Sequence, residues 1–239
     1  MIDVNVISTG SQGNAVLLNH DILIDCGVSF TALKPYIRDL KLVLLTHIHS
    51  DHFRRSTLKK LHQERPALRF GCGRWLVKPL ADLGIRPGQI DVLDDGGRYK
   101  YPGVTVEPVP LVHDVPNYGY KLHFVEQEYI CNMNCFHFLH VLYATDTVNL
   151  NGVSAEDYDL YLLEANYQED EIETRIRRKK EAGEYAYERR VLKTHLSKAA
   201  CDDFIARNAG PSSQFIYLHE HREDDRNVEQ SNSDGTPDP

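Results

Sequence analysis

Long apolar runs are missing from this sequence of 239 residues. No stretch approaches the roughly 20 consecutive apolar residues that a membrane-spanning helix needs, so no membrane partner is expected. The opening segment MIDVNVIS has neither the basic start nor the apolar stretch of a secretory signal peptide, so we expect a cytoplasmic protein. Five cysteines, an odd number without regular spacing, do not fit a disulfide framework and are typical of reduced thiols.

Clustered positive charge is also scarce, because the formal net charge is -8. The final segment REDDRNVEQSNSDGTPDP holds six acidic residues against two arginines, so the rest of the chain is only mildly acidic. This balance argues against a broad non-specific nucleic-acid surface. It remains compatible with a small nucleotide held by a metal ion, because the ion supplies the local positive charge. We expect one domain, residues 1–221, followed by a disordered acidic tail, residues 222–239.

Strand patterns and helix patterns alternate along the chain. Short apolar runs bounded by turn residues predict strands, and longer amphipathic stretches predict helices. The helix at 56–66 has Ser56 available as N-cap, and Pro79 should kink the helix at 74–84 or shift its start. This alternation favours a layered α/β sandwich with its chemistry at strand ends. The predicted strands are 4–8, 15–19, 22–27, 40–47, 68–73, 103–113, 118–130, 140–146, 159–165 and 214–221, and the predicted helices are 56–66, 74–84, 168–183 and 196–210.

Four candidate metal ligands lie in one short stretch, THIHSDH, directly behind an apolar run. They are His47, His49, Asp51 and His52. Imidazole and carboxylate together suit zinc, and they also admit manganese or iron. Any one of these histidines could instead be a hydrogen-bonding loop residue. Four such groups converging at a strand end would be electrostatically unfavourable without a cation, so the stretch predicts a metal site.

The stretch THIHSDH resembles the HxHxDH signature of the metallo-β-lactamase superfamily. Other segments follow in the order typical of that family: STGSQGN, LIDCG, VPLVHD, YATDT and IYLHEH. The opening turn STGSQGN is similar to the SxGSxGN turn of the branch that includes RNase Z-like and phosphodiesterase-like members. The resemblance implies an α/β fold of four layers, an αββα sandwich, with a two-metal site between the sheets.

The resemblance also implies seven metal ligands and two divalent ions per chain, zinc or manganese. One ion would be bound by His47, His49 and His113, the other by Asp51, His52 and His219, and Asp146 would bridge the two. His221 lies on the same strand face as His219. The family places its last ligand directly at the strand end, which favours His219.

Two further segments, LLEANY and KTHLSKAA, resemble the paired acidic and histidine motifs of RNase Z-like enzymes. In such a pair Glu164 would orient His195, and His195 would protonate the leaving group, while Asp51 would act at the metal site. The alternative for His195 is a residue at a helix start, beside Ser197 as helix cap.

The turn STGSQGN would place Ser8, Ser11 and Asn14 where they could bind substrate or steady the ligand loop. Its glycines could equally serve backbone geometry alone.

Two segments leave alternatives open. EDEIETRIRRKK has acid and arginine pairs at helical spacing and predicts a solvated helix, although its basic end could contact a substrate phosphate. ICNMNCFHFLH contains two cysteines and two histidines, including Cys131 and His140, but their spacing matches no zinc finger. The alternation in FHFLHVLY favours an extended hairpin strand.

The resemblance implies a hydrolase that attacks phosphodiester bonds with a hydroxide held between two metal ions. We expect small cyclic nucleotides such as cCMP or cUMP as substrates, similar to those of phage anti-Pycsar phosphodiesterases. The compact, mildly acidic chain has no obvious RNA-binding arm. The alternatives are an RNase Z-like or exonuclease-like nuclease acting on RNA or single-stranded DNA, and a non-catalytic binding relative. Analogy with similar enzymes suggests a homodimer.

Overall fold

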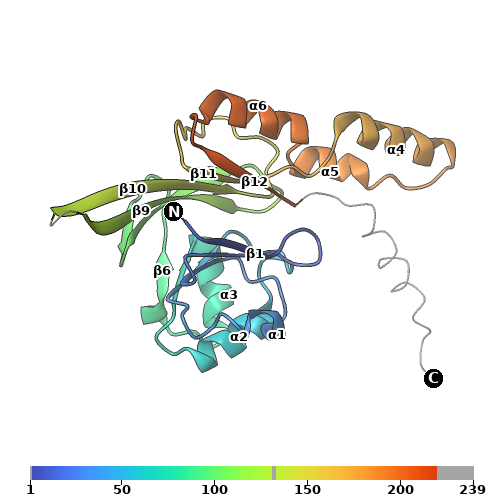
Figure 1. The fold of residues 1–239 in the computed structure, drawn as a ribbon. Coiled ribbons are helices and arrows are strands. Elements are labelled where there is room, and N and C mark those ends of the chain that lie inside the picture. The colour runs from blue at the N-terminus through green and yellow to red at the C-terminus, as the bar shows by residue number, and fades with distance from the viewer. Residues whose placement is uncertain (1, 131–132, 220–239) are drawn as a thin grey trace, which may run out of the picture.

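The computed structural model describes residues 2–130 and 133–219, in which two six-stranded sheets lie face to face between layers of helices (Figure 1). The strand order is β1-β2-β3-β4-β5-β6 in the first sheet and β12-β11-β10-β9-β8-β7 in the second. This arrangement confirms the α/β sandwich of four layers, αββα. The predicted tail, residues 222–239, lies outside the described residues, as do Cys131 and His221.

The first sheet is built from short strands, and its helices pack on its outer face (Figure 1). Strands β3 to β6 are parallel, so their carboxyl ends meet at one edge of the sheet. The elements are β1 (Val4–Ser8), β2 (Ala15–Leu18), β3 (Ile22–Ile24), α1 (Phe30–Leu33), β4 (Leu42–Leu45), α2 (Arg55–Glu64), β5 (Arg69–Cys72), the 3-10 turn η1 (Arg74–Leu76), α3 (Val77–Ala81), the 3-10 turn η2 (Pro87–Gln89) and β6 (Ile90–Val92).

The second sheet carries the longest strands. Strands β9 and β10 pair from Tyr120↔Tyr143 out to Ile130↔Met133, and this hairpin extends beyond the sandwich (Figure 1). The hairpin interpretation of the segment before Ala144 is therefore confirmed for the described residues. The elements are β7 (Tyr99–Tyr101), β8 (Val104–Leu111), β9 (Asn117–Ile130), β10 (Met133–Ala144), β11 (Leu160–Glu164), α4 (Glu169–Glu181), α5 (Glu188–Thr194), α6 (Lys198–Asn208) and β12 (Gln214–Leu218).

Strand β4 shows why the first sheet has one hydrophobic core on each of its two faces. Val43 and Leu45 pack toward the helices, whereas Leu42 and Leu44 pack between the sheets. Because both faces are covered, every residue of the strand is buried, as its continuous apolar sequence predicts. A third core lies between the second sheet and α6. These layers hold the loop after β4 against the ends of the second sheet.

Helix α2 starts earlier than predicted, whereas the start of α3 is shifted to Val77, one of the two outcomes expected from Pro79. Helix α2 begins at Arg55, and its N-cap is Arg54 in place of the expected Ser56; Arg54 has extended backbone and makes no side-chain cap. Pro79 lies in the first turn of α3, where a backbone N–H has no acceptor within the helix, so the proline costs no hydrogen bond. Helix α5 was not predicted at all. Among the described residues, no helix is long and apolar enough to cross a bilayer.

Candidate active site

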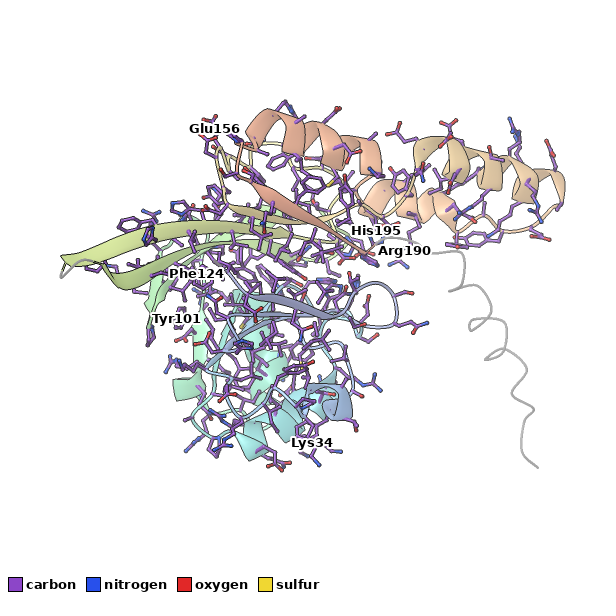
Figure 2. The ribbon with its side chains drawn as sticks, in the orientation of Figure 1. Lys34, Tyr101, Phe124, Glu156, Arg190 and His195 are labelled. Atoms are coloured by element: carbon purple, nitrogen blue, oxygen red, sulfur yellow. The ribbon has the colours of Figure 1, made fainter. Side chains whose placement is uncertain are left out.

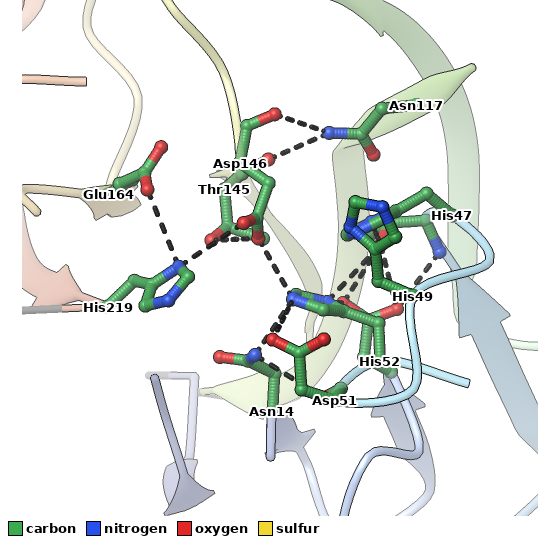
Figure 3. A network of polar contacts seen from close by, with 12 residues as sticks. Asn14, His47, His49, Asp51, His52, Asn117, Thr145, Asp146, Glu164 and His219 are labelled. Carbon is green, nitrogen blue, oxygen red and sulfur yellow. Dashed lines mark hydrogen bonds and ion pairs between the residues drawn. The ribbon is translucent and has the colours of Figure 1, made fainter. Parts of the chain in front are cut away.

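The ends of several strands meet at one edge of the sandwich, and the predicted ligands lie there; Figure 3 labels all of them except His113. The loop after β4 carries four of them, and β8, β10 and β12 are each followed by one more. Residues from both sheets therefore face one another across this edge. The seven are His47, His49, Asp51 and His52 from the first sheet, and His113, Asp146 and His219 from the second.

Three histidines form the first ligand group. The Nδ1 atom of His49 lies 3.1 Å from Nε2 of His47 and 3.3 Å from Nε2 of His113. Two nitrogens bound to one tetrahedral zinc ion at about 2.0–2.1 Å would lie about 3.3 Å apart. The spacing of these three nitrogens therefore fits a zinc ion that all three could bind.

The surroundings of two of these histidines favour the neutral imidazole, which is the form that binds a metal. Burial lowers the pKa of His47 to about 2, and the neighbouring His52 acts in the same direction. The Nδ1 atom of His47 lies 2.9 Å from Oγ1 of Thr46, which leaves Nε2 of His47 directed at the cluster. Burial also lowers the pKa of His113, whose Nδ1–H donates to the carbonyl of Thr194 at 3.0 Å. The nitrogen that faces the cluster thus keeps its lone pair in both residues.

The second ligand group surrounds Asp146. One carboxylate oxygen lies 2.9 Å from Nε2 of His52, and the other lies 3.4 Å from Nδ1 of His219. Asp51 approaches more loosely, with Oδ2 3.7 Å from the same His52 nitrogen. The buried Nδ1 of His219 has no well-formed hydrogen bond among the described residues and points at carboxylates of Asp146 and Glu164, 3.4 Å from each. A buried nitrogen so placed suits a cation. Ligand atoms of Asp146, His52 and His47 also lie within 4.8 Å of one another, so Asp146 is close to both predicted ligand groups.

The charges of this group balance through protons when no cation is present. Burial disfavours a charged imidazole, but Asp146 and Asp25 outweigh burial and raise the pKa of His52 well above its ordinary value. Asp146 and Glu164 likewise overcome burial and raise the pKa of His219 to about 9. Burial would raise the pKa of Asp146, yet His219 and His52 hold it well below its usual range. A metal ion that binds these residues must displace the protons on both histidines.

Asp25 fixes the orientation of His52, a role that the sequence did not reveal. Its Oδ2 lies 2.7 Å from Nδ1 of His52, and its other oxygen accepts hydrogen bonds from the backbone and hydroxyl of Thr46. The side chain is fully buried. The only sequence signal was the stretch LIDCG, in which Asp25 follows β3 directly. Such a carboxylate raises the basicity of a ligating histidine and holds its ring.

The turn before β2 contacts the ligand loop through Asn14, which agrees with the second of its two expected roles. Its side chain, only 2% exposed, bonds to the backbone of Gly10 and lies 2.8 Å from Nε2 of His52. These contacts connect the turn to the ligand loop, and a direct role of Asn14 in substrate binding stays a prediction. Ser11 is exposed and lines the cleft, whereas Ser8 is half-buried at the end of β1 and is not among the cleft residues.

The predicted acid and histidine pair lies beside the ligands. Glu164 is fully buried at the end of β11, with Oε1 2.6 Å from Nδ1 of His195. Its second oxygen accepts from the backbone N–H groups of Thr147 and Leu196, so the carboxylate is fixed on both sides. His195 ends helix α5, and Ser197 caps α6 by accepting from the N–H of Ala200. The helix-cap alternative is thus correct for Ser197 without excluding the paired role of His195.

A cleft of 300 Å³ opens over these groups. Helix α5 forms one wall and brings Arg190, which the sequence did not single out. The guanidinium donates to Asp114 at 2.5 Å, and Asp114 in turn lies 3.4 Å from Nε2 of His49. The lining residues are Ser11, His49, Asp51, His113, Asp146, Tyr187, Arg190, Val191, Thr194, His195 and His219.

Three residues that shape the site have strained backbones. Asp25, Asp146 and His219 have φ angles of 61°, 55° and 55°, in the left-handed region that residues with a side chain rarely adopt. Each follows the end of a strand, where the chain turns sharply. Strain of this kind is typical of functional sites and is held in place by the surrounding structure.

Gly27 gives a test of how tightly the ligand loop is packed. A Cβ atom at this position would overlap the carbonyl group of Asp51, which accepts a hydrogen bond from the N–H of Asn14 at 2.6 Å. We expect Gly27→Ala to lower the free energy of unfolding by about 3 kcal/mol, because backbone must move. Denaturant titration measures this change. Gly88→Ala is the control, since its Cβ would meet nothing within 4 Å; equal effects of the two substitutions would contradict the packing argument.

Comparisons with known proteins agree with this geometry. A family profile described as "Beta-lactamase superfamily domain" matches residues 20–197. The metallo-β-lactamase fold protein YhfI from Bacillus subtilis has a similar structure, with a TM-score of 0.67, 16% identity and coverage of 97% of this chain and 92% of that chain. The short form of human tRNase Z is similar with a TM-score of 0.63, 15% identity and 93% coverage of both chains. No curated protein matched the sequence.

Proposed function

Since this chain belongs to the β-lactamase superfamily and is a metal-dependent hydrolase, we propose that it cleaves phosphodiester bonds, with small cyclic nucleotides such as cCMP or cUMP as substrates. The observation that carries the proposal is the Glu164–His195 pair, 2.6 Å apart, at the edge of the ligand cluster. A phosphodiester needs both an electrophilic site for its oxygens and a proton for its leaving alkoxide. The presence of candidate metal ligands and of His195 in one cleft supports both tasks.

Metal ions bound by the seven residues would supply Lewis acidity toward phosphoryl oxygens and a water molecule of lowered pKa. His195 would supply the proton. Glu164 accepts the hydrogen bond from Nδ1, which holds the ring and leaves Nε2 as the nitrogen that can transfer a proton to the leaving oxygen. Asp51 lines the same cleft, 24% exposed, where it can act as a ligand and orient the attacking water.

The size of the cleft supports a small substrate. Its volume of 300 Å³ is at the lower end of the range for small-molecule pockets, about 300–1,000 Å³. The basic segment RIRRKK lies in α4, none of whose residues line the cleft. A short anionic substrate with one phosphate therefore fits the site better than a long polyanion.

One observation favours a second candidate, a nuclease. A hollow of 690 Å³ shares Ser11 and Asp51 with the cleft and continues to Arg54 and Arg55 at the start of α2. Neither arginine has an ion pair among the described residues. This hollow could hold the next phosphate of an RNA or DNA strand.

A substrate panel distinguishes the two candidates. We expect cCMP or cUMP to be hydrolysed to the monophosphate faster than single-stranded DNA or precursor tRNA, with metal content measured on the same sample. The variant Arg54→Glu/Arg55→Glu should leave turnover of cyclic nucleotides within about twofold, because one phosphate does not reach these arginines. If cyclic nucleotides are inert, while cleavage of RNA or DNA is strong and falls steeply in this variant, the nuclease is the correct function.

A further inference from the structure

One face of helix α5 is turned toward the ligand cluster. Four cleft residues, Tyr187, Arg190, Val191 and Thr194, are spaced three, four and seven positions apart, which places them on the same side of the helix. The helix ends at Thr194, and His195 is its C-cap residue. Figure 2 shows Arg190 and His195 close together at the open edge between the two sheets. A single short helix therefore brings a cation, an aromatic ring and the proposed proton donor to one cleft.

Arg190 is held over the site and keeps most of its donors free. Its Nη2 donates to Oδ2 of Asp114, and the other oxygen of Asp114 lies 3.2 Å from Nε2 of His113. This is the one hydrogen bond of the guanidinium among the described residues, whereas the group has five N–H donors. The side chain is 69% exposed on the cleft side. A guanidinium that uses one N–H to bond to a carboxylate can donate its remaining N–H groups to a phosphate.

Tyr187 is held from the neighbouring helix. Lys179 of α4 lies 4.1 Å above the tyrosine ring and forms an ion pair of 2.7 Å with Glu188, whose side chain is 4% exposed. The ring is thus fixed on the wall of the cleft while 40% of its residue surface remains accessible. A fixed aromatic ring beside a phosphate site offers a stacking surface for a nucleobase.

We propose that this face of α5 recognises the substrate: Arg190 binds a non-bridging phosphate oxygen, and Tyr187 stacks on the base. This inference rests on the proposed function and names the chemistry of its substrate, a nucleoside phosphodiester. The basic residue Lys179 then serves to position Tyr187, and the rest of RIRRKK lies outside the recognition surface. Arg190 is a binding residue, and its ion pair with Asp114 aims it.

The first test separates phosphate binding from a purely structural ion pair. Arg190→Ala should raise KM for cUMP by about 10- to 100-fold, because a charge-assisted bond to phosphate is lost, and Arg190→Lys should recover part of this loss. Metal content should stay unchanged. Arg189→Ala is the matched control, because Arg189 is exposed on the same helix and is not among the cleft residues. Lower metal affinity with an unchanged KM would mean that Arg190 only supports Asp114, and would overturn the proposal.

The second test addresses the base. Tyr187→Ala should raise KM for cUMP about tenfold and leave KM for a base-free ribose 3′,5′-cyclic phosphate unchanged. Equal effects on both substrates would rule out stacking. Calorimetric binding of uridine monophosphate, measured with and without zinc, keeps the inference testable apart from catalysis. If wild type binds the monophosphate and Arg190→Ala does not, recognition stands even where phosphodiester hydrolysis fails; equal binding by both would overturn it.

Discussion

Replacing Asp146 with asparagine is expected to release both metal ions together and to lower turnover by about four orders of magnitude. The carboxylate is 3% exposed and lies between His52, at 2.9 Å, and His219, at 3.4 Å. An amide keeps the shape but removes the charge that the two ions would share if Asp146 bridges them. Asparagine also tolerates the left-handed backbone at this position, so the fold should survive. Elemental analysis of dialysed protein measures the ions, and turnover of cUMP measures the loss.

His219→Ala is the informative partner variant, because His219 belongs to one of the two predicted ligand groups. It should weaken one ion and leave the other in place at the histidine triad. If Asp146→Asn keeps one ion at full affinity, Asp146 binds a single metal and does not bridge. Fewer than one ion per wild-type chain, after mild purification in zinc or manganese, would contradict the two-metal site itself.

His195→Ala should lower turnover by about two to three orders of magnitude while leaving metal content intact. Proton donation to the leaving group is its proposed role, and its Nδ1 is engaged by Glu164 at 2.6 Å. A substrate with a good leaving group needs little protonation, so bis-p-nitrophenyl phosphate should be hydrolysed by the variant with a much smaller loss. Steady-state kinetics on the two substrates, with metal content determined in parallel, measures both effects.

The metal content of His195→Ala distinguishes two roles that the geometry allows for this histidine. His195 lies 3.4 Å from Asp146, and the set Asp146, Glu164, His195 and His219 could itself hold a cation. Loss of metal in His195→Ala would therefore identify His195 as a ligand in place of a proton donor. Glu164→Gln is the control for orientation: it should reduce turnover of cUMP less than His195→Ala does, because the histidine remains.

Most of the fold could be predicted because the apolar pattern dictates it locally. The run LVLL of β4 is buried on both faces, and the segment FHFLHVLY forms a strand of the β9–β10 hairpin. Helix α5 escaped prediction because its seven residues, ERRVLKT, include only two apolar residues, which are adjacent in sequence and give no helical period. The start of α2 was misplaced because Ser56 is a better cap than Arg54 on propensity alone. Tertiary contacts decide such boundaries.

The site divides in the same way. The candidate ligands can be recognised in the sequence by their residue types and their order. The residues that orient them can be recognised only from their positions in the fold. Asp25 reaches His52 because the backbone reverses at a positive φ, and Asp114 reaches Arg190 across 76 positions of sequence. Asn14 has the chemistry of a substrate ligand, and only the fold shows that its side chain is buried against His52. Residue type cannot distinguish these roles without the fold.

The division of the ligands between the two sheets links metal binding to cooperativity. Each predicted ion would take ligands from the loop after β4 and from an end of the second sheet, so no ion is fully bound unless both layers are docked. Binding energy therefore stabilises the docked sandwich alone and adds nothing to states in which the layers have separated. Without ions, the two halves are coupled by the apolar layer between the sheets and by polar contacts such as the His52–Asp146 pair and the hydrogen bond from the N–H of His219 to Thr9. With ions bound, local opening at this edge would also lose the free energy of metal binding. The two sheets with their helices are then expected to unfold together.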